Sequence, residues 1–296
     1  MNKPISKGTV RIISRLDIKG PNLVKGVNLE GLRVLGKPEV FARYYYEQGA
    51  DELLYMDIVA SLYQRNNLLD IVKRTSREVF IPLTVGGGLR SIEDIRTTLR
   101  AGADKVALNT AAINEPELIA KAARIFGSST IVVSVEAIKR PDGSYEAYTD
   151  NGRQSTGKDA VAWAIEAARL GAGEILVTAI QNEGAGKGFD LSLTRKIASS
   201  VSVPVIACGG AGTPDDCLQV IHGGQADAVC LASVLHYYFV NNGNPWGDFS
   251  GEGNVEFLKN KGSFMRGKNF ALREIKDYLA RNNVPCRPVA EGKVYA

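Results

Sequence analysis

The sequence predicts an α/β protein, a (β/α)8 TIM barrel assembled from two duplicated half-barrels. Short apolar runs alternate with amphipathic stretches of helical length, which is typical of βαβ units and a parallel sheet. There are eight such runs, and a closed eight-stranded barrel fits a chain of 296 residues. The alternative is an open doubly wound sheet, which would place its glycine-rich turn after the first strand. Here the glycines follow the third and seventh strands.

The eight apolar runs give the expected strands in order along the chain. They span residues 10–16, 52–57, 82–85, 105–108, 130–136, 174–178, 203–208 and 228–231. Amphipathic stretches predict helices between most of them, and a last helix that closes the barrel. The helices are expected at residues 38–48, 68–77, 92–100, 115–126, 160–170, 191–199, 214–222 and 272–282.

Two segments interrupt this alternation. Residues 141–155 are polar and carry Asp142-Gly143 at a turn, which predicts a small hairpin after the fifth strand. Residues 240–268 are rich in Asn and Gly and follow the eighth strand on the rim. Long irregular loops in compact domains are usually either functional or disordered, and both readings stay open here. We expect one barrel domain over residues 1–296, with an insertion at 240–268.

Sequence motifs recur about half the chain length apart. Gly49-Ala50-Asp51-Glu52 recurs as Gly171-Ala172-Gly173-Glu174, which is 122 residues later. Gly87 and Gly209 differ by the same 122 positions. A constant offset over half of a barrel predicts two duplicated four-stranded halves. The third and seventh strands should then face each other, as should the first and fifth.

Each half carries a glycine-rich corner at the end of a strand, where barrel proteins build their sites. Glycines let backbone N–H groups approach an anion without a Cβ clash, and a following helix offers its N-terminal N–H groups. Two such corners predict a substrate with two phosphate groups, although each corner alone could be only a tight turn. The corners comprise Gly86, Gly87, Gly88, Asn109 and Thr110 in the first half, and Gly209, Gly210, Gly212, Ala232 and Ser233 in the second.

Two carboxylates occupy matching positions in the two halves. Asp17 ends the first strand and Glu136 ends the fifth, 119 residues later, so they should project from opposite walls into one mouth. Such a pair acts as general acid and base when its two environments separate the pKa values. The alternative is that they pair with Lys25 or other basic groups and hold the rim together. Asp57 and Glu183 could line the same cavity.

Neither histidine is well placed for chemistry at this mouth. His222 lies on a surface-like helical stretch, and His236 follows the second corner. The sequence has no Ser-His-Asp or Cys-His arrangement and no metal-ligand spacing. We therefore expect no metal and no cofactor.

Four charged residues lie at or near strand starts, at the end of the barrel away from the chemistry. Two acids and two bases there could form a closed ring of ion pairs. The ring could be a layer that stabilises the barrel or a gate across its axis, and the sequence does not separate these readings. The four residues are Arg11, Glu52, Lys105 and Glu174.

Composition narrows the partners and the compartment. With 36 basic and 32 acidic residues, the net charge of +4 is too small to indicate nucleic-acid or membrane binding. The sequence has no apolar run of 18 residues and no signal peptide, and its four cysteines lack CxxC spacing. Cys208 and Cys230 lie in apolar runs, as buried thiols in a reducing cytosol do, so we expect a cytoplasmic protein.

The chain resembles the cyclase subunit of imidazole glycerol phosphate synthase over about residues 9–238 and 270–288. The resemblance implies a duplicated barrel that receives ammonia along its axis from a glutaminase and acts on a bis-phosphorylated aminoimidazole-carboxamide ribonucleotide. The matching motifs are Leu16-Asp17-Ile18-Lys19, Val24-Lys25-Gly26, Thr84-Val85-Gly86-Gly87-Gly88, Gly102-Ala103-Asp104-Lys105-Val106, Asn109-Thr110-Ala111-Ala112, Gly209-Gly210-Ala211-Gly212 and Ala232-Ser233-Val234.

The resemblance also implies roles for single residues. Asp17 would be a catalytic acid or base with Glu136 as its partner, and the charged ring at the strand starts would be the ammonia gate. Asp104 would face the glutaminase in a heterodimer, and Lys25 would lie on a mobile substrate loop. The expected substrate and phosphate positions are Lys25, Gly87, Gly88, Asn109, Thr110, Thr178, Glu183, Gly184, Gly209, Gly210, Ala232 and Ser233.

Three features depart from that family. Its second catalytic aspartate is here Glu136, its aspartate after strand six is Glu183, and residues 240–268 have no counterpart. Lengthening a carboxylate by a methylene shifts it by about 1 Å, which can change a rate about 100-fold. The first hypothesis is an ammonia-dependent lyase and cyclase of histidine biosynthesis. The alternatives are a paralogous ammonia-channelling barrel for amidination of a surface-polysaccharide sugar, and a non-catalytic phosphate-binding scaffold that activates a glutaminase.

Overall fold

Eight parallel strands close into a barrel in the computed structural model, which describes residues 8–60, 68–243 and 269–289. Neighbouring strands pair in chain order, and the pairing of β12 with β1 closes the barrel. The predicted (β/α)8 barrel is thereby confirmed. The barrel strands are β1 (Arg11–Lys19), β4 (Glu52–Asp57), β5 (Leu83–Gly86), β6 (Lys105–Leu108), β7 (Ile131–Lys139), β10 (Glu174–Ala179), β11 (Val205–Cys208) and β12 (Ala228–Leu231).

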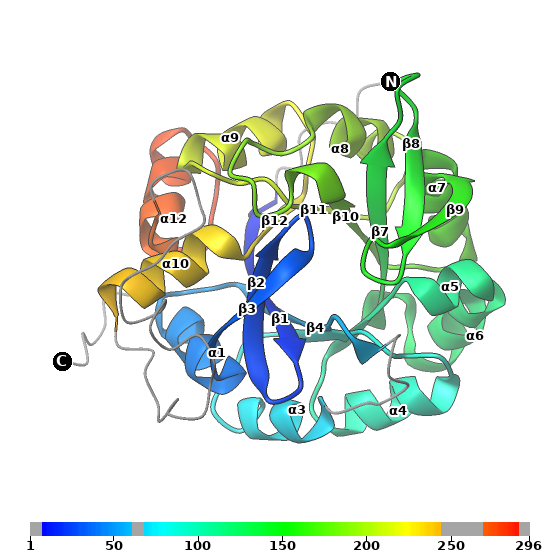
Figure 1. Ribbon diagram of the computed structural model, residues 1–296, viewed down its shortest axis with the longest axis horizontal. Helices are drawn as coiled ribbons and strands as arrows, with labels where there is room; N and C mark the ends of the chain where they lie inside the picture. The colour runs from blue at the N-terminus through cyan, green and yellow to red at the C-terminus, as the bar shows by residue number, and fades with distance from the viewer. Residues whose placement is uncertain (1–7, 61–67, 244–268, 290–296) are drawn as a thin grey trace.

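Helices surround the strands as a ring, with apolar side chains packed between the two layers (Figure 1). Several of them begin and end at the predicted residues because their amphipathic stretches lie between clear turn signals. In chain order they are α1 (Pro38–Glu47), α3 (Leu69–Thr75), α4 (Ile92–Arg100), α5 (Thr110–Asn114), α6 (Glu117–Phe126), α7 (Ala160–Leu170), α8 (Leu191–Ala198), α9 (Pro214–His222), α10 (Ser233–Asn242) and α12 (Leu272–Arg281), with short 3-10 turns η1 (Ser128–Thr130) and η2 (Ile180–Asn182). No helix in these described ranges is long and apolar enough to span a membrane.

The helix predicted over residues 115–126 is α6, which begins at Glu117, and a further short helix, α5, precedes it. Glu115 lies between them with φ −133° and ψ 82°. It precedes Pro116, whose ring disfavours the α conformation in the residue before it. The helix that follows Asn109 is therefore the short α5.

A hairpin that the sequence reading missed lies against the end of β1. Its strands are β2 (Asn22–Val27) and β3 (Glu30–Gly36), and β2 pairs antiparallel with β1. Val24 of this hairpin packs with apolar side chains of the barrel lumen, including Ile13. Figure 1 shows the hairpin in blue near the middle of the view. It therefore covers part of the barrel mouth.

The segments predicted to interrupt the barrel have two outcomes. After β7 the chain turns at Asp142-Gly143 and returns antiparallel as β8 (Tyr145–Thr149), as predicted, and continues as β9 (Gln154–Asp159). The insertion does not begin at Val240, because Val240 is a buried residue of α10. Its remainder, residues 244–268, lies outside the described residues, so the single-domain assignment stays a prediction.

The two halves share their local chemistry as well as their strand order. Ser91 and Asp94 form a capping box at the start of α4, and Thr213 and Asp216 form the matching one at α9, 122 residues later. Strands β5 and β11 lie four strands apart in the closed barrel, so they face each other across it. The duplication predicted from the sequence therefore extends to helix caps.

Candidate active site

A closed ring of ion pairs lies at the amino ends of the strands. Arg11 Nη1 lies 2.5 Å from Glu52 Oε1 and 2.8 Å from Glu174 Oε1. Lys105 Nζ lies 3.1 Å from Glu52 and 3.2 Å from Glu174. Each carboxylate thus contacts both cations, which is the geometry expected for the four charged strand starts. Its role as a gate remains a prediction.

Asp104 lies near this end of the barrel and has a structural contact of its own. Its exposed carboxylate accepts a hydrogen bond of 2.8 Å from Leu83 N, at the start of β5. Asp51 and Asp227 make the same bond to Ile12 N and Val205 N. This recurring contact explains the aspartate without a partner protein, so the predicted partner-facing role stays a prediction.

An apolar level separates the ring from the mouth. Residues of seven barrel strands pack together inside the lumen as one cluster. Small neutral molecules can pass such surfaces more readily than ions, because an isolated charge is costly to bury. The level includes Ile13, Leu54, Ala107, Val132, Leu176 and Ile206.

Asp17 lies at the carboxyl end of the lumen, bound by two cations. Its Oδ1 accepts a 2.7 Å hydrogen bond from Arg15 Nε, and its Oδ2 accepts one of 2.9 Å from Lys25 Nζ. Lys25 also contacts Glu183, and all four side chains are buried. The structure thus confirms the alternative expectation that Asp17 pairs with Lys25.

The two cations determine the ionisation of Asp17. Burial alone would raise the pKa of Asp17, but Arg15 and Lys25 together hold it well below its ordinary value. Burial would likewise lower the pKa of Lys25, but Asp17 and Glu183 raise it above its ordinary value. Asp17 is therefore an anion at neutral pH, held by two fixed positive charges.

Glu136 projects from β7, on the opposite wall from Asp17, as the duplication predicts. Burial raises the pKa of Glu136 to about 7, although Arg15 and the Gly152 N–H limit the rise. Its Oε2 has no hydrogen-bond partner among the described residues. The neighbouring Thr178, which is its register partner on β10, also has an unpartnered hydroxyl. The two carboxyl groups therefore differ in protonation at neutral pH.

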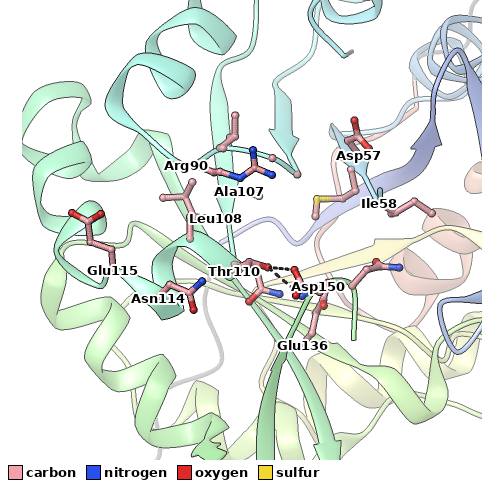
Figure 2. A pocket seen from close by; sticks show the side chains of 17 residues that line it. Asp57, Ile58, Arg90, Ala107, Leu108, Thr110, Asn114, Glu115, Glu136 and Asp150 are labelled. Carbon is pink, nitrogen blue, oxygen red and sulfur yellow. Dashed lines mark hydrogen bonds between the residues drawn. The ribbon is translucent and has the colours of Figure 1, made fainter. Parts of the chain in front are cut away.

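The first glycine corner opens into a cavity of about 290 Å³. Gly87, Gly88, Asn109, Thr110 and Glu136 all line it, so one cavity joins the predicted anion corner to a predicted catalytic residue. Figure 2 shows Glu136 and Thr110 on one side of this cavity and Asp57 across it. The cavity can hold a phosphate group beside a carboxyl group.

The second corner is much smaller. Its residues line a space of about 20 Å³, which is enough for about one water molecule. A Cβ at Gly210 would lie 2.1 Å from Gly188 O, so only glycine fits this turn. The predicted residues that line it are Glu183, Gly184, Gly209, Gly210, Ala232 and Ser233. The two corners are thus equivalent in sequence position but unequal in open volume.

Arg15 is the site residue that the sequence reading missed. Alternate residues of a strand face the same side, so Arg11, Ile13, Arg15 and Asp17 all face the lumen. The sequence did contain an indication of this, because Arg15 lies two residues before Asp17 and residues two apart on a strand face the same side. His236 is buried with its Nδ1 2.6 Å from Tyr45 Oη, and burial together with the charge of Lys25 lowers its pKa to about 3.

The described part of the chain contains no group of three or more His, Cys, Asp and Glu side chains arranged to hold a metal ion. The ionisable groups and the larger cavity lie together at the carboxyl ends of the strands. This arrangement defines the class of (β/α)8 barrels with a site in that mouth.

The family model described as histidine biosynthesis protein matches residues 11–241. The chain therefore belongs to the histidine biosynthesis protein family.

Three relatives in that family carry the name imidazole glycerol phosphate synthase subunit HisF. The protein of Legionella pneumophila is 61% identical over 203 residues, which is 69% of this chain and 96% of that protein. One from Dehalococcoides mccartyi is 46% identical over 259 residues, 88% of this chain and 98% of its own length. One from Alkaliphilus metalliredigens is 48% identical over 229 residues, 77% and 91% respectively.

Proposed function

We propose that this chain is the cyclase subunit of an imidazole glycerol phosphate synthase. It uses ammonia to convert a bis-phosphorylated aminoimidazole-carboxamide ribonucleotide into imidazole glycerol phosphate and the free carboxamide ribonucleotide, which is a lyase reaction. The name shared by its relatives supports this activity. The observation that carries it is the carboxyl pair Asp17 and Glu136, which lie on opposite walls in environments that shift their pKa values in opposite directions.

In this proposal the two carboxyl groups divide the acid–base chemistry. Asp17 is ionised and serves as the base, and Glu136 holds a proton near neutral pH and serves as the acid. One phosphate group binds beside Gly87, Gly88 and Thr110 in the open cavity. The other binds at the second corner, which must widen because its present space holds about one water molecule.

Ammonia comes from a glutaminase subunit that docks at the amino ends of the strands. The charged ring of Arg11, Glu52, Lys105 and Glu174 crosses the barrel axis there, and the apolar level lies directly above it. Ammonia that passes both levels arrives at the mouth beside Asp17 and Glu136. The ring is partly exposed in the isolated chain, so a subunit docked on this face reaches it directly.

The test supplies purified protein with an ammonium salt and the bis-phosphorylated ribonucleotide, and follows the appearance of imidazole glycerol phosphate. Turnover without any glutaminase is expected, because ammonium replaces the channelled ammonia. A matched Asp17→Asn protein controls for contaminating enzyme. A folded protein that forms no product at any ammonium concentration would disprove the cyclase assignment.

The second candidate is an ammonia-channelling barrel for amidination of a surface-polysaccharide sugar. The specific observation in its favour is that Asp17 is bound by both Arg15 and Lys25 while the second phosphate corner is nearly closed. The ring and the apolar lumen would serve this function equally well. Glutaminase stimulation by the barrel, without cyclase turnover, is the result that would favour it.

A further inference from the structure

Arg15 is an almost fully buried arginine inside the barrel lumen, with 1% of its surface exposed. Its Nε donates to Asp17 Oδ1 at 2.7 Å, and its Nη1 lies 3.6 Å from Cys208 Sγ. Its Nη2 has no hydrogen-bond partner among the described residues. A buried guanidinium is costly unless it is paired, so this residue requires a reason.

The charges around Arg15 do not balance when every group is ionised. Three buried carboxyl groups, those of Asp17, Glu183 and Glu136, interact with two buried cations, Arg15 and Lys25, while Asp57 lies across the cavity. Both cations contact Asp17, and Lys25 also contacts Glu183. Neither cation forms a salt bridge to Glu136 in the described structure, and Oε2 of Glu136 has no partner. One negative charge is therefore in excess, and it falls on Glu136.

We propose that Arg15 is a positioning residue that keeps Asp17 an anion on β1 and thereby leaves the one mobile proton of the mouth on Glu136. The inference rests on the proposed cyclase only for its kinetic consequence. The direction of each pKa supports it, because that of Asp17 is lowered by Arg15 and that of Glu136 is raised to about 7 by burial.

The same count of buried charges predicts the effect of replacing Arg15 by a neutral residue. The cluster would then hold three carboxyl groups against Lys25 alone, so the pKa values of these carboxyl groups should rise. The rise should be largest for Asp17, since it loses the hydrogen bond from Nε. A carboxylate that has lost its fixed cation is no longer held in place as the base of the pair. The titratable and charged groups facing this cluster are Arg15, Asp17, Lys25, Glu136, Glu183, Cys208, Cys230, His236 and Tyr237.

The experiment titrates the carboxyl groups of the intact chain by ¹³C NMR, with Asp17→Asn and Glu136→Gln proteins to assign the two resonances. In the natural protein Asp17 should stay ionised through the acidic range while Glu136 titrates near neutrality. In Arg15→Met the midpoint of Asp17 should rise by about 1–3 pH units, as expected for loss of an adjacent opposite charge. Arg15→Lys, which keeps the charge, should restore most of the original midpoint.

An unchanged Asp17 midpoint in folded Arg15→Met would overturn the proposal, because a purely structural arginine would leave it in place. Should Arg15→Met not fold, the natural protein decides by itself. There, an ionised Glu136 below neutrality or an Asp17 that titrates near neutrality overturns the assignment.

A kinetic arm separates this inference from the proposed cyclase. With ammonium as nitrogen source, Arg15→Met should lower kcat by about 100-fold or more, within the range for loss of acid–base catalysis, while KM for the ribonucleotide changes little. Partial recovery of kcat is expected in Arg15→Lys. If the natural protein has no turnover, the proposed function fails, while the NMR midpoints still decide the role of Arg15.

Discussion

Lys25 Nζ lies 2.9 Å from Asp17 Oδ2, and this ion pair joins the β2–β3 hairpin to barrel strand β1. The same ammonium contacts Glu183, in the loop after η2. Asn28 N adds a 2.7 Å hydrogen bond to Glu183 O. One lysine thus connects the hairpin to two walls of the mouth, at the point where the acid–base chemistry is proposed.

Replacing Lys25 should destabilise the protein strongly. Lys25→Met leaves two buried carboxylates short of a cation, and breaking a buried ion pair from one side costs about 3–5 kcal/mol. Urea unfolding measures this difference directly. The exposed Lys19→Met, at the end of β1 beside β2, is the matched control and should change stability by less than about 0.5 kcal/mol. Equal effects of the two substitutions would contradict the structural role of this ion pair.

Asp17→Asn should abolish ammonium-driven cyclase turnover, with a loss of about 100-fold or more in kcat, because the mouth loses its base. Glu136→Asp should preserve or raise turnover, since it keeps a carboxyl group at the position where the family carries aspartate. Steady-state kinetics with saturating ammonium tests both. Full activity in Asp17→Asn would show that the acid–base assignment is wrong.

The protonation of Glu136 predicts how stability depends on pH. Its pKa of about 7 in the folded protein lies above its ordinary value of 4.5. Its stabilising contribution is therefore complete below the unfolded pKa and is lost as pH rises through 7. Between about pH 5.5 and about pH 8 the loss is on the order of 2 kcal/mol, at about 1.4 kcal/mol per pH unit.

The control for this pH dependence is Glu136→Gln, which is neutral at both pH values. Urea unfolding of both proteins at each pH gives the difference between them. The glutamine variant should gain stability relative to the natural protein as pH rises. A constant difference between the two proteins would mean that Glu136 titrates far from neutrality.

Two glycines with similar backbone angles should respond very differently to alanine. Gly87 has φ +94°, and an added Cβ would lie 2.2 Å from Asp57 O. Gly143 has φ +84°, but an added Cβ meets nothing within 4 Å. We expect Gly143→Ala to cost about 1–2 kcal/mol for backbone strain alone. Gly87→Ala should cost on the order of 4 kcal/mol, because the corner itself must move.

Thermal and urea unfolding of these two variants would measure the difference. Gly87→Ala should also weaken binding of the phosphorylated ribonucleotide, since Gly87 lines the open cavity. Similar stabilities for the two variants would show that the first corner can shift at little cost.

Local pattern predicts much of this fold. Strands β4, β6 and β12 begin and end at the residues expected from their short apolar runs. The hairpin of β2 and β3 was missed, because its pairing depends on the extension of β1 rather than on its own residues. The short helix α5 was also missed, although Pro116, which limits it, was visible in the sequence. Sequence patterns thus predicted most accurately those elements whose structure depends on their own residues.

The repeated motifs were enough to predict the barrel, its two halves, the charged ring and the opposition of Asp17 and Glu136, since each depends on spacing along the chain. Folding decided how the charges pair. Lys25 reaches Asp17 and Glu183 only because the hairpin lies on the mouth, and Arg15 occupies the lumen between the walls. Ion pairing and pKa values depend on distances of a few ångströms in a buried, weakly screening interior, and those distances arise only when segments far apart in sequence pack together.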